Sequence, residues 1–268
     1  MQLYHHPYSL NSQRVRLALE EKSIDYTSHC INPITGKNMD SSFFRMNPSA
    51  RLPFFQNGSH VIFDPVEIIQ YINRIGSIFS FNLETTSIYS KCIYEWIKRL
   101  RDWNSTHFTL PHIPVKYRAL VSKFMRRVII ARMAECPDLA SAYHLKLKDA
   151  YRAEERLSDP ENFQQARTHL MLMLDEVEEM LRENEFLAGG EFSMADVMFI
   201  PVLARLALLN LEGEYINCRP NVHGYWALAQ RRPSYRKVIG RYFDGWRKYK
   251  TLIRTWCLVR MRSMLKRY

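Results

Sequence analysis

The stretch LPFFQNGSHVIFDPVEIIQYINRI, residues 52–75, predicts a β-hairpin followed at once by an amphipathic helix. Two runs suited to strands are joined around Asn57-Gly58, a dipeptide that strongly favours a tight hairpin turn. Asp64 stands where a helix N-cap is expected, and Pro65 stands at the first helical position. The isoleucines at positions 68, 69 and 72 then fall on one helical face. We therefore expect this unit to close a small α/β domain.

The residues before the hairpin alternate between strand and helix patterns. A strand is predicted over residues 2–4, a helix over about 12–22, a second strand over 24–30 and a short helix over 41–48. Together with the hairpin and its helix, these elements give the order β-α-β-α-β-β-α within residues 1–76. That order is the one of a thioredoxin-like domain.

The second part of the chain has a purely helical pattern. Apolar residues recur at helical spacing over residues 87–240, which predicts an all-α domain that follows a loop over residues 76–86. Ser193 followed three residues later by Asp196 is a capping-box pattern. We expect these two residues to have a structural role at the start of a helix.

The chain has 268 residues and a formal net charge of +11, most of which lies at its C-terminal end. From Arg236 to Tyr268 there are eleven Lys and Arg residues against one acidic residue, so this segment carries ten of the eleven net charges. Residues 241–268 have the pattern of a basic amphipathic helix with tryptophans. Such a helix suits an anionic membrane surface, here through residues 246–268. Nucleic acid ranks lower as a partner, because no base-reading motif accompanies the charge.

We expect this tail to pack on the protein body in its first part and to project from it in its second part. We expect the part near Trp246 to pack on the protein body, and the part from about Trp256 onward to project. The alternative is that the whole apolar stripe packs on the body and the charges are simply solvated.

Composition narrows the class of protein further. A hydrophobic fraction of 47% and 13% aromatic residues are typical of a globular chain. We find no secretory signal and no uncharged span of about 20 residues that could cross a membrane. The five cysteines are dispersed without ligand-like spacing, which predicts reduced thiols and no metal site. We therefore expect a cytoplasmic protein that can lie peripherally at the cytosolic face of a membrane.

Four features of the chain occur in the order found in glutathione transferases. They are the thioredoxin-like first third, the segment NPSARLP before the hairpin, the acidic residue that opens the next helix, and the capped helix beginning in FSMAD. Each is weak alone, but together they make the whole chain resemble that family. The run LYHHPYSLNSQRVRLALEEKSIDYTSH, with a long insertion through residues 107–160, is most similar to the plant tetrachlorohydroquinone dehalogenase-like class. The resemblance implies a glutathione-binding domain over residues 1–76 and a helical domain over residues 87–240.

The resemblance also implies a reaction, in which the glutathione thiolate attacks an electrophilic carbon. A free thiol has a pKa of about 8.5 and needs a stabilising donor to ionise at neutral pH. In serine-type members of the family that donor sits six residues before the Val of an Arg-Val pair, which here is Ser9, counted back from Val15. Taken alone, Ser9 could also be a turn-forming serine after a proline. Ser12 is expected to cap the first helix, and it is the alternative thiol ligand.

The glutathione-binding residues follow from the same resemblance. Leu52-Pro53 matches the family's cis-proline step, at which the backbone of Leu52 pairs with the cysteinyl part of glutathione; a trans proline at a strand start is the alternative. The other implied contacts are Lys37, Asn38 and Arg51 toward carboxylate groups and Asp64 toward the γ-glutamyl end. For Lys37, Asn38 and Arg51, a solvated surface role is equally compatible with the sequence.

Two positions depart from the family pattern. Pro65 stands where the family has a serine whose hydroxyl and N–H bind the γ-glutamyl carboxylate, and proline offers neither. Two hydrogen bonds to a charged group, each worth roughly 1–3 kcal/mol, are missing unless another donor compensates. Asn11 stands two residues after Ser9, where bacterial reductive dehalogenation needs a cysteine, so we expect no dehalogenase activity.

Taken together, these observations predict a serine-type glutathione transferase acting on small hydrophobic electrophiles or peroxides. Glutathione is the expected co-substrate, and a homodimer is the assembly that the family implies. The first helix of the helical domain is expected to line the pocket for the second substrate, with Tyr94, Trp96 and Trp103 as candidates; because most aromatic residues at helical spacing belong to the core, the pocket is left unassigned. The alternative, favoured by Pro65, is a non-catalytic ligand-binding or membrane-associated adaptor on the same fold.

Overall fold

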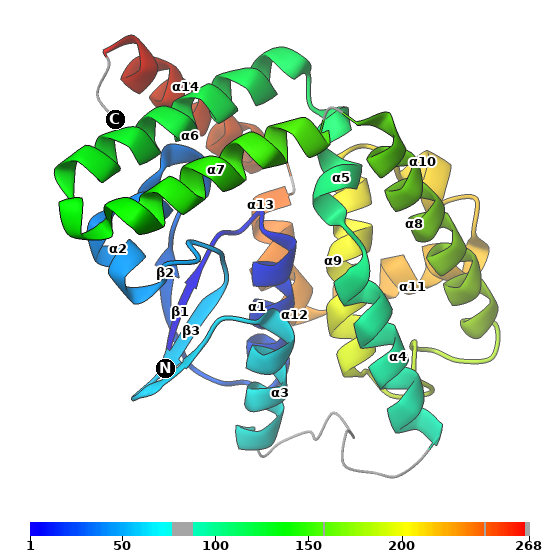
Figure 1. Ribbon diagram of the computed structural model, residues 1–268. Helices are drawn as coiled ribbons and strands as arrows, with labels where there is room; N and C mark the ends of the chain where they lie inside the picture. The colour runs from blue at the N-terminus through cyan, green and yellow to red at the C-terminus, as the bar shows by residue number, and fades with distance from the viewer. Residues whose placement is uncertain (77–87, 158, 244, 266–268) are drawn as a thin grey trace.

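The computed structural model describes residues 1–76, 88–157, 159–243 and 245–265 (Figure 1). Most of the predicted loop over residues 76–86 lies outside this part of the chain. Within it, the N-terminal domain contains a four-stranded sheet of order β2-β1-β3-β4. β1 runs parallel to β2 and antiparallel to β3, which pairs with β4 in the predicted hairpin. The strands are β1 (Gln2–His5), β2 (Thr27–Cys30), β3 (Phe54–Asn57) and β4 (His60–Ile62).

The two faces of this sheet bury different side chains, because successive residues of a strand point to opposite sides. Leu3 and Phe55 belong to the main core with the helices α1 and α3. On the other face, the rings of Tyr4 and Phe54 contact Phe43 of α2. The order of elements confirms the thioredoxin-like prediction. The helical segments of this domain are α1 (Leu10–Glu21), η1 (Pro33–Thr35), η2 (Lys37–Met39), α2 (Ser41–Met46) and α3 (Pro65–Ile75).

The helical domain is organised around α9 (Met194–Leu208), whose side chains are all buried from Met194 to Ala204. It packs against α1 of the first domain and against α4 (Ile88–Asp102), so one core continues through both domains. The other helical segments around it are α5 (Ser105–Thr109), η3 (Leu110–His112), α8 (Pro160–Met180), α10 (Glu212–Tyr215), α11 (Pro220–Arg231), α12 (Pro233–Tyr235), η5 (Arg236–Gly240) and α13 (Arg241–Phe243).

The insertion is a pair of helices, α6 (Val115–Glu135) and α7 (Ala140–Leu157), joined by η4 (Pro137–Leu139). Figure 1 shows the two helices lying side by side, next to α2 and β2. A second core holds it there, in which the ring of Tyr143 stacks on Phe44 with centroids 4.2 Å apart. The Tyr143 hydroxyl also donates to the carbonyl oxygen of Met39 at 2.8 Å. The insertion therefore buttresses the N-terminal domain.

The basic tail forms α14 (Trp246–Met264), but it packs differently from our expectation. Its second half contacts α6 and η1, and Val259 is 1% exposed within the second core. Asn32 Nδ2 also donates to Thr255 Oγ1 at 3.1 Å. Trp246, by contrast, is 72% exposed. The expected arrangement is therefore wrong: the side chain of Trp246 is exposed, and the part from about Trp256 onward is anchored through Val259 in the second core.

The described residues offer neither a membrane-spanning helix nor a cluster of metal ligands. None of their helices combines the length and the apolar character that crossing a membrane requires. They also contain no group of three or more His, Cys, Asp or Glu side chains placed to hold a metal ion.

The predicted capping box at the start of α9 is present and fully satisfied. Asp196 is 0% exposed and accepts hydrogen bonds from the N–H of Leu187, the N–H and the hydroxyl of Ser193, and the Tyr225 hydroxyl, at 2.7–3.1 Å. Because four buried donors converge on one carboxylate, the Ser193–Asp196 pair holds the turn before α9 to the body of the domain.

Removing this carboxylate should be costly. We expect Asp196→Ala to lower the free energy of unfolding by at least about 3 kcal/mol, because each buried donor left without a partner costs roughly 1–3 kcal/mol. Urea denaturation measures the change. The nearby exposed Glu191→Ala is the control and should change it by less than about 0.5 kcal/mol. Equal midpoints for the two variants would contradict the structural role of Asp196.

Candidate functional site

Ser9 lies at the N-cap of α1, the position from which a side chain reaches the first free N–H groups of a helix. Its Oγ accepts from the N–H of Ser12 at 3.4 Å, so the hydroxyl proton remains able to donate to a ligand. The N-terminus of α1 also contributes positive potential there, which favours an anion. The geometry suits stabilisation of a thiolate.

Ser12 is not the helix cap, which corrects our expectation. The Ser9 side chain caps the helix. The helix therefore begins at Leu10, two residues before the predicted start at about residue 12. Ser12 is 0% exposed, and its Oγ accepts from the N–H of His6 at 3.3 Å. A hydroxyl enclosed in this way does not reach the surface, so the structure does not favour Ser12 as the alternative thiol ligand.

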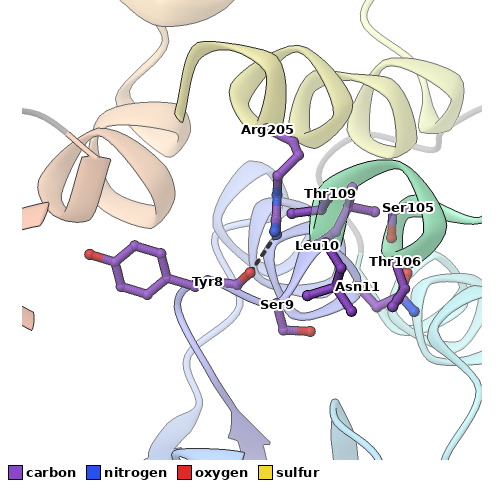
Figure 2. Close-up of a pocket in the computed structure, with 9 residues that line it drawn as sticks. Tyr8, Ser9, Leu10, Asn11, Ser105, Thr106, Thr109 and Arg205 are labelled. Atoms are coloured by element: carbon purple, nitrogen blue, oxygen red, sulfur yellow. Dashed lines mark hydrogen bonds between the residues drawn. The ribbon is translucent and has the colours of Figure 1, made fainter. Parts of the chain in front are cut away.

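A cavity of about 260 Å³ opens beside Ser9 (Figure 2). Its walls come from the start of α1, from α5 and from Arg205 of α9, and Figure 2 shows Arg205 reaching down toward the first turn of α1. The lining residues are Tyr8, Ser9, Leu10, Asn11, Ser105, Thr106, Thr109, Leu110 and Arg205. Hydroxyl and amide groups are common in this wall, so the cavity is more polar than a pocket for hydrophobic electrophiles would be.

The expected aromatic pocket is not at this place. Trp96 and Trp103 are buried in the core, where their indole N–H groups donate to the Met180 sulfur and the Ala166 carbonyl oxygen. Tyr94 is 49% exposed and does not line the cavity. The two tryptophans are core residues, which is the usual role of aromatic residues at helical spacing, and the cavity is lined instead by the short helix α5 that the sequence did not distinguish.

Two arginines, the buried Arg14 and the half-buried Arg205, make the surroundings of Ser9 electropositive. Arg14 donates from its three guanidinium nitrogens to the carbonyls of Met198 and Leu100 and to Asn11 Oδ1, at 2.9–3.1 Å. Arg205 Nη2 donates to the Tyr8 carbonyl oxygen at 2.5 Å. Burial lowers the pKa of Arg14 to about 9 and that of Arg205 to about 10, so both stay charged at neutral pH. No carboxylate of the described residues forms an ion pair with either of them.

His6 is a neutral neighbour of this cluster. Burial, together with the charge of Arg205, lowers its pKa to about 4, so it carries no charge at neutral pH. The positive charges near Ser9 are therefore those of the two arginines and the helix terminus.

The glutathione-binding residues expected from the sequence lie in two groups. Leu52-Pro53 is a cis peptide bond, as predicted. Lys37 and Arg51 are exposed and free to meet a ligand. Asn38 is buried, and its Nδ2 donates to the Ala50 carbonyl oxygen at 3.0 Å, so it braces the segment before Leu52 from inside.

Asp64 forms the other group, together with an arginine that the sequence did not reveal. One oxygen of Asp64 accepts from the N–H groups of Val66 and Glu67 and caps α3. The other oxygen lies 3.3 Å from Nη2 of Arg101, which α4 brings from the helical domain and whose side chain is 60% exposed. This position therefore combines the expected carboxylate with a cation next to Pro65.

Comparison with known proteins identifies the family. The family model for the N-terminal domain of glutathione S-transferases matches residues 8–75, and that for the C-terminal domain matches residues 151–240. The chain is also 61% identical over 268 residues to Glutathione S-transferase TCHQD of Arabidopsis thaliana, covering 100% of both chains. The chain belongs to the glutathione S-transferase family. The residues between the two matched ranges of this transferase include α6 and much of α7, which agrees with their description as an insertion.

More distant relatives agree with this fold. The tetrachloro-p-hydroquinone reductive dehalogenase of Sphingobium chlorophenolicum is 25% identical over 248 residues, covering 91% of this chain and 97% of the relative. The crystal structure of poplar glutathione transferase F1 superposes with a TM-score of 0.64 at 19% identity, over 92% of this chain and 98% of the other. In this transferase Asn11 lies in the cavity wall and its Oδ1 accepts from Arg14, so that position offers no thiol.

Proposed function

We propose that this glutathione S-transferase is a serine-type enzyme, in which the Ser9 hydroxyl stabilises the thiolate of bound glutathione. The observation that carries the proposal is the position of Ser9, which caps α1 on the wall of a cavity and keeps its hydroxyl proton available. A donor at a helix N-terminus lowers the pKa of a thiol, because it binds the charged form.

The chemistry follows from that ionisation. The thiolate attacks an electrophilic carbon, a carbon–sulfur bond forms, and the leaving group departs with its electron pair. With a peroxide, the sulfur attacks one oxygen, the oxygen–oxygen bond breaks, and the other oxygen leaves with the electron pair and takes up a proton as the alcohol. A second glutathione then reduces the resulting sulfenic acid, giving glutathione disulfide and water. The uncompensated charges of Arg14 and Arg205 act in the same direction as Ser9, because positive potential favours the sulfur anion over the thiol.

Glutathione itself would lie between the two groups of residues described above. The backbone of Leu52 would pair with the cysteinyl part, and Lys37 and Arg51 would face carboxylate groups of the tripeptide. Asp64 would face the γ-glutamyl amino group. Arg101 supplies a donor that Pro65 lacks, and it stands close enough to Asp64 to contact the γ-glutamyl carboxylate.

The tail supports a second part of the proposal, which is attachment to an anionic membrane surface at the cytosolic face. Large apolar side chains of α14 are exposed along much of its length, and Arg254 and Arg260 are exposed with them. Tryptophan beside arginine suits the boundary of a lipid layer, where each basic residue contributes about 1 kcal/mol. The exposed apolar residues are Trp246, Tyr249, Ile253, Trp256, Met261, Met264 and Leu265. Homodimerisation stays a prediction from the family.

Replacing Ser9 tests the catalytic proposal. We expect Ser9→Ala to lower kcat/KM for glutathione and chlorodinitrobenzene by about 100-fold, the usual cost of losing one donor to a developing anion. The pH at which the rate is half-maximal should also rise, because the bound thiol loses its stabilising donor. Ser59→Ala, at an exposed serine of the hairpin turn, is the control. Unchanged kinetics and pH profile for Ser9→Ala would refute the assignment.

Replacing Arg101 tests how glutathione is held. We expect Arg101→Ala to weaken glutathione binding by about 10-fold or more in calorimetric titration, since a charged hydrogen bond is lost. An analogue with a 4-aminobutyryl group in place of γ-glutamyl lacks that carboxylate and should lose little. Arg99→Ala, on the same helix but paired with Glu176, is the matched control. Absence of saturable binding to the unmodified protein would support the adaptor alternative, and equal effects of the two variants would exclude Arg101 as the donor.

Vesicle sedimentation tests the tail. The protein should pellet with vesicles containing about one-third phosphatidylserine, less so at high salt, because surface electrostatic attraction is screened. We expect the paired substitution Trp246→Glu and Ile253→Glu to reduce the bound fraction by about 10-fold. Leu172→Glu, at a side chain of α8 that is 65% exposed, is the control. Equal pelleting of all three proteins would rule out membrane attachment through α14.

A further inference from the structure

The cavity beside Ser9 contains two buried polar groups whose hydrogen-bonding capacity is unused. Arg205 and Thr109 line its wall, and one atom of each, Arg205 Nε and Thr109 Oγ1, is enclosed without a hydrogen-bond partner among the described residues. Buried polar groups are normally paired, because leaving one unpaired costs about 1–3 kcal/mol. Two such groups in the wall of one cavity point to a ligand that pairs with them.

The charge of Arg205 specifies the sign of that ligand. A guanidinium has five N–H donors, and here the Tyr8 carbonyl accepts from Nη2. That carbonyl is neutral, so the hydrogen bond orients the guanidinium without cancelling its charge. His6, the titratable neighbour in the loop between β1 and α1, is neutral at neutral pH, and Arg14, which donates to Asn11 in the cavity wall, is a second cation. The unused capacity is therefore that of a cation, which an anionic oxygen satisfies best.

The other walls agree with an oxygen-rich ligand. Ser105 and Thr106 of α5 and Asn11 of α1 bring further polar side chains to the cavity. Its volume of about 260 Å³ lies below the usual range for drug-sized ligands, about 300–1,000 Å³, so the ligand must be small. Since Ser9 belongs to the same wall, a molecule bound here lies next to the sulfur that Ser9 would hold.

We propose that this cavity binds the carboxylate of the electrophilic substrate, with Arg205 and Thr109 donating to its oxygens, so that the enzyme prefers small electrophiles that carry a carboxylate. This inference rests on the proposed function, because it takes Ser9 as the place of the thiolate. It narrows the class of second substrate from hydrophobic electrophiles to anionic ones.

A matched pair of substrates tests the preference. A chloronitrobenzoate and the corresponding chloronitrobenzamide, each with chlorine ortho to the nitro group, have nearly the same size and shape, but the first carries an anionic carboxylate and the second a neutral amide. In both, the glutathione sulfur forms a bond to the chlorine-bearing carbon, and chloride leaves with the electron pair of the broken carbon–chlorine bond. The carboxylate does not react. Each kcat/KM, measured at saturating glutathione, is divided by the rate constant of the uncatalysed reaction to remove differences in intrinsic reactivity.

For the unmodified protein, the normalised kcat/KM of the carboxylate substrate should exceed that of the amide by about 10-fold or more, since one charged hydrogen bond corresponds to at least a tenfold effect. Arg205→Met should bring this ratio to about 1 or below. Arg205→Lys should keep part of the preference because it keeps the charge. Arg231→Met, at an exposed arginine of α11, removes the same charge from the protein and should leave the ratio unchanged.

Arg205 also holds the Tyr8 carbonyl, so Arg205→Met could fail to fold. Thr109→Val is the second variant; it replaces an unpaired buried hydroxyl by a methyl group and should lower the ratio several-fold while the protein stays folded. A ratio at or below 1 for the unmodified protein, or the same ratio in Thr109→Val and in the unmodified protein, would overturn the proposal.

Binding without turnover separates this inference from the proposed function. Benzoate and benzamide are titrated calorimetrically into the unmodified protein and into the same variants. Tighter binding of benzoate that Thr109→Val weakens supports the carboxylate site even if neither chlorinated substrate is turned over, in which case Ser9 catalysis is the part that fails. Turnover of the amide together with equal binding of benzoate and benzamide would leave the transferase activity standing and refute the carboxylate site.

Discussion

The buried guanidinium of Arg14 is the interaction on which the arrangement of the site depends. It extends from α1 and donates to a carbonyl of α9, a carbonyl of α4 and the side chain of Asn11. These three acceptors belong to both domains and to the first turn of α1, so one side chain sets where Ser9 stands relative to the helical domain. All three acceptors are neutral, and the protein therefore keeps a net positive charge beneath the N-cap. The contact that joins the domains is also a source of the potential that favours an anion at Ser9.

The insertion and the tail stabilise the glutathione-binding domain from its other side. α6 and α7 pack against α2 and against η2, which carries Lys37 and Asn38, and Val259 of α14 belongs to the same second core. Arg132 of α6 adds an ion pair to Asp40 at 2.8 Å. Lys37 nevertheless remains exposed. Because α14 is fastened through the face that bears Val259, its opposite face, with Trp246, is left to the solvent or to a partner.

Local signals in the sequence were sufficient for the first domain and insufficient for the site. Asn57-Gly58 and the Asp64 cap were recognisable because a hairpin turn and a helix start depend on neighbouring residues. The roles of Ser9 and Ser12 were partly misjudged, since a cap can precede the apolar pattern by a turn. Arg101 and Arg205 could not be found at all, because they act on residues 37 and 197 positions away in the chain and only the packed domains bring them there.

Pro65 removes hydrogen-bond donors from the site, and two arginines that the sequence did not reveal bring donors to it. Proline at the first position of α3 makes that helix start well but removes an N–H and a hydroxyl from the place where a carboxylate is expected. Arg101 restores a donor there, and because it is a cation on an exposed side chain, it can attract a carboxylate over a longer distance than an N–H can. Arg205 brings a second guanidinium to the wall of the cavity that Ser9 also lines. If glutathione and its co-substrate bind as proposed, guanidinium groups of the helical domain hold the anionic groups, and substrate affinity then depends on the packing of the two domains against each other.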